Sequence, residues 1–399
     1  MDLESVRLAT SPEGLALIDS LPPYGELEPL VVAERLRSEG VDSALVSVAL
    51  TQARLRAVAA AKFGEFARGM LFTQAGLEQS TRLAVAARHA DRFREAGIER
   101  VADLTAGIGA DAMAMAALDL GVIAFEIDEA TALIADHNLR HWPDAAVVHA
   151  DSLATLARGD IDAQGAFADP ARRTARGRRH DPRDYSPPLD AVIALRERFP
   201  ALGIKLGPAV AHEDLPASIP KSPVEAQWVS VDGDVVEAAL WFGPLVRSEG
   251  HCAMVIRDNT AFELTGTTEH ATAGPLGTHV IEPDGAVIRS GLVGELAARI
   301  GARLMDPTIA YLTGEELIPT PFGQTFRIVE QLPYSERTLA AALRARGVGT
   351  LEIKKRGMDI APEALRGRLK LKGDASATVI LTRALGKRVA LIVERVSAT

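Results

Sequence analysis

The stretch Val101-Ala-Asp-Leu-Thr-Ala-Gly-Ile-Gly-Ala-Asp-Ala-Met-Ala114 is typical of a buried strand that passes through a glycine turn into a helix. Gly107 and Gly109 can adopt φ values that are closed to other residues, and they place no Cβ in the way of a ligand. The helix that begins near Ala110 would direct its free N–H groups at a ligand above the turn. The stretch predicts a nucleotide-binding turn, and Gly107-x-Gly109-x-x-Ala112 also fits the dinucleotide fingerprint.

Acidic residues close the strands that are expected to follow this turn. Val122-Ile-Ala-Phe-Glu-Ile-Asp128 is expected to form a second strand, and a carboxylate at its end can accept hydrogen bonds from both hydroxyls of a ribose. A third strand, Ala146-Val-Val-His-Ala-Asp-Ser152, ends in Asp-Ser, and a fourth, Gly165-Ala-Phe-Ala-Asp-Pro170, ends in Asp-Pro. Because NAD, FAD and S-adenosylmethionine (SAM) all contain a ribose, the second strand alone leaves the nucleotide open.

The pattern as a whole resembles the class I SAM-dependent methyltransferases, over roughly residues 60 to 257. Within that class, Asp103-Leu-Thr-Ala-Gly-Ile-Gly-Ala-Asp-Ala112 is most similar to the RNA guanine-N2 methyltransferases, including the trimethylguanosine synthase group. The helical segment ahead of the fold, Ala61-Lys-Phe-Gly64 followed by Gly76-Leu-Glu-Gln-Ser-Thr81, is similar to theirs as well. The resemblance implies SAM as the cofactor, in place of NAD.

The resemblance implies a role for each acidic residue, and each has a plainer alternative. Glu126 would hold the ribose or be a solvated strand end, and Asp128 would hold a ribose hydroxyl or cap the following helix. Asp103 would orient the glycine turn or reach the methionine amino group, or serve the fold alone. Asp151, assisted by Ser152, would accept from the adenine amino group or cap the next helix. The predicted cofactor-binding residues are Asp103, Thr105, Gly107, Gly109, Glu126, Ile127, Asp128, Asp151 and Ser152.

The Asp-Pro turn is the predicted catalytic element. In amino-group methyltransferases with Asp-Pro-Pro and an aromatic residue, the carboxylate and a neighbouring backbone carbonyl accept hydrogen bonds from the target NH₂, which is catalysis by positioning. By this resemblance Asp169 and Pro170 are the predicted catalytic residues. The chain departs from the family pattern at two positions, since Ala171 replaces the second proline and Arg172 stands where the aromatic residue would be.

Substrate contacts are expected in the residues that follow this turn. Tyr185 is close enough in sequence to supply the missing aromatic ring, and a purely structural role in its loop is the alternative. For Arg172 and Arg173 we expect contacts with phosphate or base, the alternative being ion pairs with acids nearby in the chain.

Composition bounds the class of protein. With 399 residues, 47% of them hydrophobic, the chain is expected to form two or three domains with a large core. Apolar runs such as Val389–Val393 are much shorter than the roughly 20 residues of a bilayer span, and Met1-Asp-Leu-Glu-Ser5 lacks a signal, so we expect a cytoplasmic protein without membrane contact. The single cysteine, Cys252, excludes an internal disulfide. His137 and His141 share a helix face, but we expect surface histidines and no metal site.

The spacing of apolar residues predicts three parts of the chain. Residues 1–98 are expected to be helical, and residues 99–264 to form an α/β domain with a Rossmann-like, seven-stranded methyltransferase sheet. Its first five strands are expected at Val101–Leu104, Val122–Glu126, Ala146–Val148, Ala166–Ala168 and Leu202–Leu206. A sixth strand at Glu225–Val231, a helix at Val235–Trp241 capped by Asp234, and an antiparallel seventh strand at Cys252–Ile256 would complete the sheet.

Residues 270–399 are expected to form a smaller α+β domain. The expected order is a strand at Phe326–Gln331, a helix at Ser335–Arg346, a strand at Leu351–Lys355, a helix at Pro362–Lys370, and a hairpin of Ala377–Thr382 and Arg388–Val393. This order, together with its Lys and Arg content, resembles the THUMP-type modules that accompany RNA-modifying methyltransferases.

Charge is unevenly distributed along the chain. The formal net charge is −9, yet residues 341–399 carry 13 Lys or Arg against 5 Asp or Glu. We therefore expect this basic end to bind RNA, with Lys354, Lys355 and Arg356 as predicted contacts, the alternative being an ordinary solvated surface.

The leading hypothesis is a SAM-dependent methyltransferase that acts on an exocyclic amino group in RNA. The alternatives are a small-molecule methyltransferase and a SAM-binding RNA-interaction protein in which the changes at Ala171 and Arg172 have abolished catalysis. Salt dependence of binding separates an RNA substrate from a small neutral one. The sequence leaves the oligomeric state open.

Overall fold

The computed structural model describes residues 1–159, 161–171, 173–174, 177–178, 185–218, 222–316 and 318–396, with only the backbone at 173, 174, 177 and 178. The chain divides into two compact units. The first consists of residues 1–207, 211–224 and 239–247, and the second of residues 208–210, 225–238 and 248–399.

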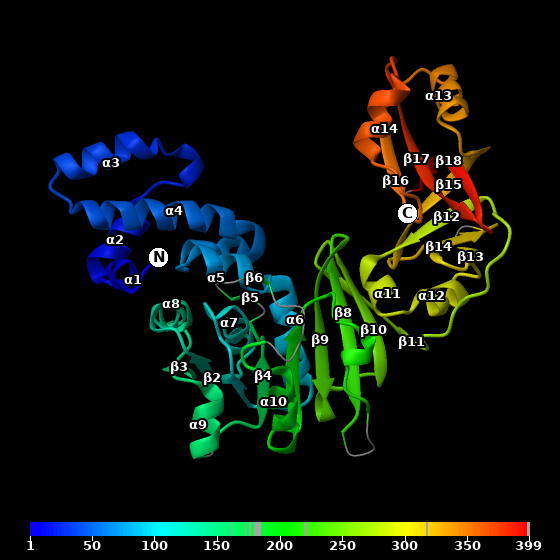
Figure 1. The fold of residues 1–399 in the computed structure, drawn as a ribbon. Helices are drawn as coiled ribbons and strands as arrows, with labels where there is room; N and C mark the ends of the chain where they lie inside the picture. Colours follow the sequence, from blue (N-terminus) through cyan, green and yellow to red (C-terminus); the bar gives the residue numbers. More distant parts are fainter. Residues whose placement is uncertain are drawn as a thin grey trace. The chain divides into compact units, whose positions relative to one another are not determined.

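The N-terminal region is helical, as the sequence predicts (Figure 1). Side-chain caps explain where several helices begin, because Asp2, Ser11, Asp42 and Thr73 each accept a hydrogen bond from a backbone N–H of the first turn. The helices are α1 (Leu3–Thr10), α2 (Pro12–Ser20), α3 (Pro29–Ser38), α4 (Ser43–Phe63), α5 (Gln74–Gln79) and α6 (Leu83–Glu95), with 3₁₀ turns η1 (Tyr24–Glu26) and η2 (Gly64–Arg68).

The segment Ser43–Arg68, which comprises α4 and η2, is long and apolar enough by length and composition alone to cross a membrane. The expectation that apolar runs are much shorter than a bilayer span therefore missed this segment. A core helix passes the same test, and α4 has a buried polar residue in Gln52. The Gln52 side chain donates to the carbonyl oxygen of Phe72 at 2.8 Å and accepts from its N–H at 3.0 Å. Apolar residues of the same helix, among them Val48, Leu55 and Phe63, are buried in a hydrophobic cluster.

The main sheet has nine strands in the order β11-β10-β8-β9-β7-β4-β1-β2-β3. Five of them run parallel and confirm the predicted α/β arrangement: β1 (Arg100–Asp103), β2 (Gly121–Glu126), β3 (Ala145–His149), β4 (Gly165–Ala168) and β7 (Ala201–Leu206). Between them along the chain lie α7 (Ala110–Ala117), α8 (Glu129–Leu139), α9 (Ser152–Arg158) and α10 (Leu189–Ala194), followed by η4 (Leu195–Glu197). A separate two-stranded ladder joins β5 (Arg173–Thr174) to β6 (Gly177–Arg178).

The predicted helix at Val235–Trp241 is wrong, because these residues belong to strand β9 (Asp234–Phe242). β9 follows β8 (Val224–Val231) across a two-residue turn in which Asp232 and Gly233 both have positive φ, 51° and 91°. Two successive positive φ values define the type I′ turn of a tight antiparallel hairpin, so the chain reverses where a helix was expected to begin.

The predicted seven-stranded sheet is also too small, and its last strand is assigned the wrong direction. Strand β10 (Gly250–Arg257) runs parallel to β8 and antiparallel only to β11 (Thr260–Gly266), an additional strand. The reason follows from the hairpin: β9 reverses the chain, the turn η6 (Gly243–Leu245) reverses it again, and β10 is paired with β8.

A seven-stranded, mostly antiparallel sheet lies in the C-terminal region, in the order β13-β14-β12-β15-β18-β17-β16. The elements predicted from Phe326 onward are confirmed as β15 (Gly323–Pro333), α13 (Glu336–Ala345), β16 (Val348–Lys355), α14 (Pro362–Leu369), β17 (Ala375–Ala384) and β18 (Lys387–Arg395). Not predicted were β12 (His279–Pro283), α11 (Gly285–Arg289), α12 (Val293–Arg299), β13 (Arg303–Asp306) and β14 (Ile309–Gly314).

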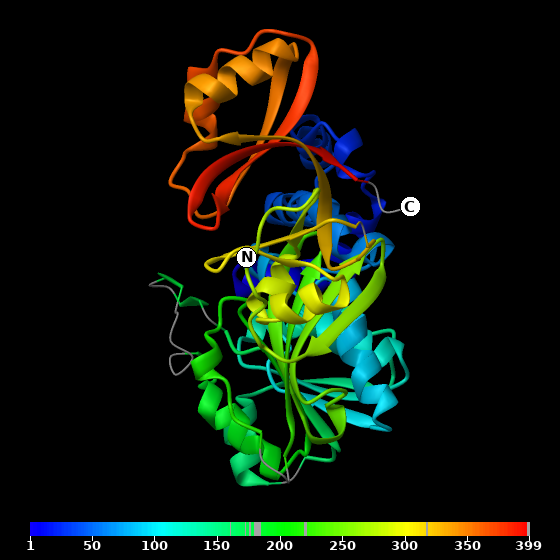
Figure 2. The same ribbon diagram turned by 90° about the vertical axis from the view of Figure 1, so that its right-hand side faces the viewer.

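Alternation along the C-terminal strands builds two small cores. On β17, Val379 and Leu381 pack with residues of α13 and α14, whereas Ile380 packs with Tyr311 and Phe326 in the other core. Figures 1 and 2 show α13 and α14 beside the strands of this sheet. Successive residues of β17 thus pack on opposite faces of the sheet, as the two-residue period of a strand predicts.

Candidate cofactor and acceptor site

The glycine turn between β1 and α7 has the geometry that its sequence predicts. Gly107 and Gly109 have φ values of 55° and 85°, in the left-handed region that favours glycine. A Cβ at Gly107 would meet no atom of the described residues within 4 Å, so the turn is open on that side. Gly109 is the N-cap residue of α7, whose first N–H groups are available to a ligand.

Glu126 is bound to the glycine turn. The N–H of Gly107 donates to Oε2 of Glu126 at 2.9 Å, and the N–H of Asp128 donates to Oε1 at 2.9 Å. Each carboxylate oxygen has a second lone pair, which is the acceptor that a ribose hydroxyl requires. Burial raises the pKa of Glu126, and the hydrogen bonds from Asp128 and Gly107 oppose that rise. The carboxylate is therefore held in place beside the turn, and it fits the ribose of SAM.

Thr105 joins the glycine turn to the predicted catalytic turn. Its N–H donates to Oδ1 of the buried Asp103 at 3.2 Å, and its hydroxyl accepts from the N–H of Asp169 at 2.6 Å. Burial, and next the nearby charge of Asp111, raise the pKa of Asp103 well above its usual value. Of the roles considered for Asp103, orienting the glycine turn is the one for which this structure contains a hydrogen bond.

The remaining predicted cofactor residues follow the ends of β2 and β3. Asp128 caps α8 by accepting from the N–H of Thr131 at 2.8 Å, and Asp151 caps α9 by accepting from the N–H of Ala154 at 2.9 Å. The capping alternative is thus realised at both positions. Ile127 is 68% exposed, whereas Ser152 is buried.

The acceptor side of the site is built around Asp169 and Pro170, directly after β4. Ala171 and Ser186 form a two-way backbone bridge, N–H to O at 2.8 and 3.1 Å, which brings Tyr185 beside the turn. The tyrosine is only 7% exposed, which favours its structural alternative. Arg172 lies outside the described residues, and the side chain of Arg173 is not among those described.

A buried polar chain that the sequence did not reveal supports Asp169. Lys205, on β7, forms an ion pair with Oδ2 of Asp169 and donates to the Thr81 hydroxyl at 3.1 Å. Thr81 in turn donates to Oδ2 of Asp111 at 2.7 Å, and Oδ1 of Asp111 lies 2.8 Å from Nδ1 of His89. Thr81, His89, Asp111 and Lys205 are all buried. Burial alone would raise the pKa of Asp111, but the hydrogen bond and charge of His89, together with the charge of Lys205, hold it below its usual value.

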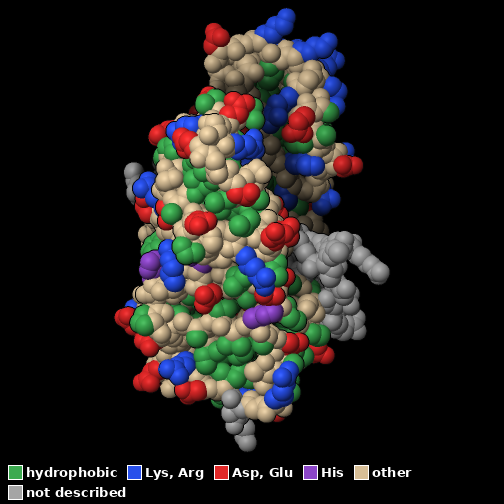
Figure 3. Space-filling model, turned by 90° about the vertical axis from the view of Figure 1, so that its left-hand side faces the viewer, with side chains coloured by type: hydrophobic (Ala, Val, Ile, Leu, Met, Phe, Trp, Pro, Cys, Tyr) green, Lys and Arg blue, Asp and Glu red, His purple; other side chains and the backbone are tan. Residues whose placement is uncertain are grey.

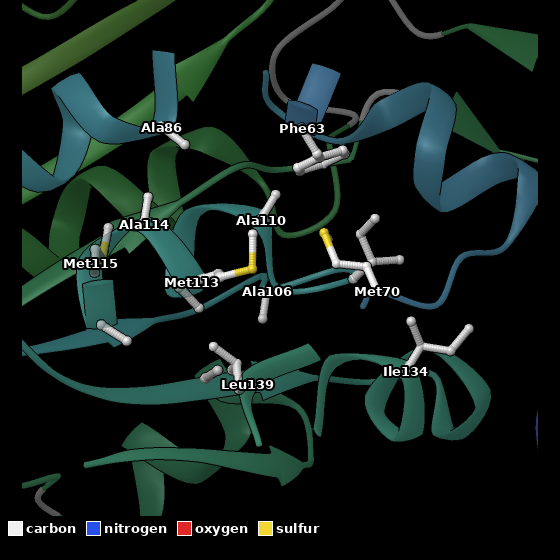
Figure 4. Close-up of a cluster of buried hydrophobic side chains, with 14 of the residues drawn as sticks. Phe63, Met70, Ala86, Ala106, Ala110, Met113, Ala114, Met115, Ile134 and Leu139 are labelled. Atoms are coloured by element: carbon white, nitrogen blue, oxygen red, sulfur yellow. The ribbon is translucent and has the colours of Figure 1, made fainter. Parts of the chain in front are cut away.

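Apolar side chains pack against the residues of the glycine turn. Ala106, Ala110 and Met113 meet Met70 from the N-terminal region and Leu139 from α8 in one hydrophobic cluster (Figure 4).

Asn138 reinforces that packing with hydrogen bonds. Its side chain donates to the carbonyl oxygens of Ile108, at 2.8 Å, and Leu71, at 3.1 Å. Its neighbour His137 is buried and lies 3.1 Å from the carbonyl oxygen of Gly69, and burial lowers its pKa to about 4. Among the described residues there is no group of three or more His, Cys, Asp or Glu that could hold a metal.

The predicted RNA contacts of the C-terminal region differ in their surroundings. Lys354 forms an ion pair with Glu282 at 2.7 Å, and the guanidinium of Arg356 lies 5.3 Å from the ring centre of Tyr311. Lys355 is exposed. Figure 3 shows positive and negative side chains mixed over the face of the molecule that it presents.

Comparison with known proteins identifies families and structures that are similar to this chain. Two family models match the chain: one described as THUMP domain-like over residues 323–395, and one described as a domain of unknown function (DUF8688) over residues 2–59. A crystal structure from Porphyromonas gingivalis W83, of a protein assigned to the methyltransferases, is similar with a TM-score of 0.77 and 22% identity, covering 96% of this chain and 98% of that one. This similarity shows the fold.

Curated relatives come from two strains of Mycobacterium tuberculosis, CDC 1551 / Oshkosh and ATCC 25618 / H37Rv. Both are described as uncharacterized S-adenosylmethionine-dependent methyltransferases, and each is 35% identical over 337 residues, which is 82% of this chain and 90% of the relative. With a glycine turn, a strand-end glutamate and an Asp-Pro turn in place, and relatives at this identity over most of their length, the chain belongs to the SAM-dependent methyltransferases and carries a THUMP-like C-terminal domain.

Proposed function

We propose that this methyltransferase, acting in the cytoplasm, transfers the methyl group of SAM to an exocyclic amino group in RNA. The observation that carries the proposal is Asp169, an ion-paired carboxylate at the end of β4 whose backbone N–H is bound to Thr105 of the glycine turn. A carboxylate in that position accepts a hydrogen bond from an NH₂ group next to the cofactor.

The chemistry required of the protein is positioning. When bound, SAM supplies a methyl group on a positively charged sulfur, an electrophile that needs no metal. Asp169 would accept one N–H of the acceptor, and the backbone carbonyl beside Pro170 would accept the other. The nitrogen lone pair would then point away from both acceptors, toward the methyl group. The N–C bond would form as the S–C bond breaks, S-adenosylhomocysteine would leave, and the methylated nitrogen would lose one proton to solvent. Holding the reacting atoms in line lowers the barrier mainly through orientation.

The RNA part of the proposal is supported by the C-terminal domain. Residues 341–399 contain 13 Lys or Arg, and among them Lys355, Lys370, Lys372, Lys387 and Arg388 are exposed. Cations of this kind bind phosphates by releasing condensed counterions. The match to a THUMP domain-like family supports the same assignment. Guanine N2 is the first acceptor to examine, because the glycine turn resembles that of the guanine-N2 methyltransferases.

The test is transfer of tritium from methyl-labelled SAM to three acceptors: total RNA from a strain lacking the gene, DNA, and a small-molecule extract of the same strain. The proposal expects label in RNA alone, with RNA affinity that falls steeply as salt rises. Label in the small-molecule extract, with little salt dependence, would establish the small-molecule alternative. Localisation is tested separately by cell fractionation with an antibody against the protein.

A further inference from the structure

Lys205 is a buried cation that none of the assigned roles uses. It lies on β7, next to β4 in the sheet, where Ile204 is paired with Ala168. Only 10% of its side chain is exposed, against 32% for that of Asp169. Removing an ammonium group from water is costly unless it is paired and hydrogen-bonded. Its retention at this position therefore depends on polar partners, which include Asp169 and Thr81.

Thr81 gives Lys205 a defined orientation. Because the Thr81 hydroxyl donates its hydrogen to Asp111, only its lone pairs remain for Lys205. Lys205 therefore donates to both the Thr81 hydroxyl and the Asp169 carboxylate. Thr81 and His89 belong to the N-terminal helical region, in which the sequence analysis assigns no site residue, so this region reaches the acceptor turn through side chains.

We propose that Lys205, oriented by Thr81, is the positioning residue that holds the Asp169 carboxylate through Oδ2 and balances its charge beside the cofactor. The proposal rests on the assignment of Asp169 to the acceptor amine and goes beyond it in two respects. It makes the N-terminal region a functional part of the catalytic centre. It also assigns Lys205 an effect on cofactor charge that is measurable without any acceptor.

That effect follows from the difference between the cofactor and its product. SAM carries one positive charge more than S-adenosylhomocysteine, and Asp169 adjoins Thr105 of the cofactor turn. Substitution of Lys205 by Met removes the cation that is paired with Oδ2 of Asp169, and the loss of one positive charge favours the charged sulfonium over the neutral thioether. The ratio of SAM affinity to S-adenosylhomocysteine affinity should therefore rise. Substitution of Asp169 by Asn should lower it.

The experiment is calorimetric titration of SAM and of S-adenosylhomocysteine into the full-length protein. For Lys205→Met we expect the ratio of SAM affinity to S-adenosylhomocysteine affinity to rise by about threefold or more. At an effective dielectric constant of about 20, the repulsion between a lysine and a sulfonium several ångströms apart is large enough to produce such a change. Lys205→Arg keeps the charge and should restore the wild-type ratio. Thr313→Val is the matched control, because it removes another buried hydroxyl far along the chain, and it should leave the affinity ratio unchanged.

An unchanged ratio in Lys205→Met that still binds S-adenosylhomocysteine would overturn the proposal. Should Lys205→Met fail to fold, Thr81→Val carries the test: a raised ratio supports the proposal, and a wild-type ratio rejects it. Methyl transfer to RNA from the strain lacking the gene is measured on the same preparations. If the wild-type protein labels no RNA while the ratio shifts as expected, the proposed acceptor is wrong and the role of Lys205 stands.

Discussion

The catalytic region and the C-terminal domain differ in how deeply their charged side chains are buried. Around the glycine turn, charged groups such as Asp103, Asp111 and Lys205 are buried. In the C-terminal domain many ion pairs are exposed, as in Arg327 with Glu394, whose side chains are 55% and 61% exposed. Water screens exposed pairs, whereas a buried charge that loses its partner pays its full desolvation cost. Single substitutions should therefore have large, specific effects in the first region and small, salt-dependent effects in the second.

The largest effect is expected at Asp169. Asp169→Asn keeps the size of the side chain but presents an amide to both Lys205 and the acceptor amine. Misplacing a positioning group costs on the order of 10²-fold in rate, so single-turnover transfer should fall by at least that much. SAM affinity and melting temperature are measured on the same preparation. Near-normal transfer by folded Asp169→Asn would remove this residue from the mechanism.

A comparable effect on binding is expected at Glu126. Glu126→Ala removes the acceptor that two backbone N–H groups hold in place, and loss of a charge-assisted hydrogen bond costs about 1.5–3 kcal/mol, or roughly 10- to 150-fold in SAM affinity. Calorimetry measures it. The control is Glu129→Ala, an exposed carboxylate one turn further along that pairs with Arg7. Equal SAM affinity in wild type and Glu126→Ala would contradict the assignment of Glu126 to the ribose of SAM.

Burial of His137 also predicts that the stability of the protein depends on pH. The pKa of His137 is lowered from 6.5 to about 4, so the unfolded chain binds a proton in this range that the folded protein does not. The free energy of unfolding should be undiminished above pH 6.5 and fall as the pH drops from 6.5 toward 4, by up to about 3 kcal/mol. Urea unfolding at pH 7.5 and 4.5 measures the change. His137→Gln should flatten it, and an equally steep fall in that variant would refute the assignment.

The smallest effect is expected in the C-terminal domain, at the exposed Lys355. Its neighbours Lys354 and Arg356 are engaged with Glu282 and Tyr311, so Lys355 is the cleaner test of RNA contact. Lys355→Glu should flatten the slope of log affinity against log salt by about 0.7–0.9 per lost phosphate contact, and leave SAM affinity untouched. Arg35→Glu, a reversal on the exposed surface of α3, is the control. An unchanged slope would make Lys355 ordinary surface.

The sequence predicts the strands and the glycine turn of the catalytic region well because its signals are local. Each parallel strand is an apolar run that stops at a glycine turn or an acid, and Glu126 is recognisable as a carboxylate at the end of such a run. The failure at Val235–Trp241 is also local. The dipeptide Asp232-Gly233 is a strong hairpin signal that outweighs the apolar run after it, and both residues adopt the positive φ of that turn.

Lys205 and Thr81 could not be predicted in the same way. They meet Asp169 only because β7 is the neighbour of β4 and because the segment before α6 reaches the end of that strand pair. Strand order is a tertiary property, which no spacing along the chain encodes. One signal was available: a lysine near the carboxyl end of a fully buried strand is as unusual as the glutamate at the end of β2, and calls for a partner.

The central claim, methylation of an exocyclic amino group in RNA, is tested most directly by nucleoside mass spectrometry. RNA from a strain lacking the gene is compared with RNA from the same strain expressing the wild-type protein or Asp169→Asn. The account predicts that one nucleoside methylated on an exocyclic amino group disappears with the gene, returns with the wild-type protein, and does not return with Asp169→Asn. Loss of a ring-nitrogen, carbon or ribose methyl group instead, or no change in any RNA nucleoside, would contradict it.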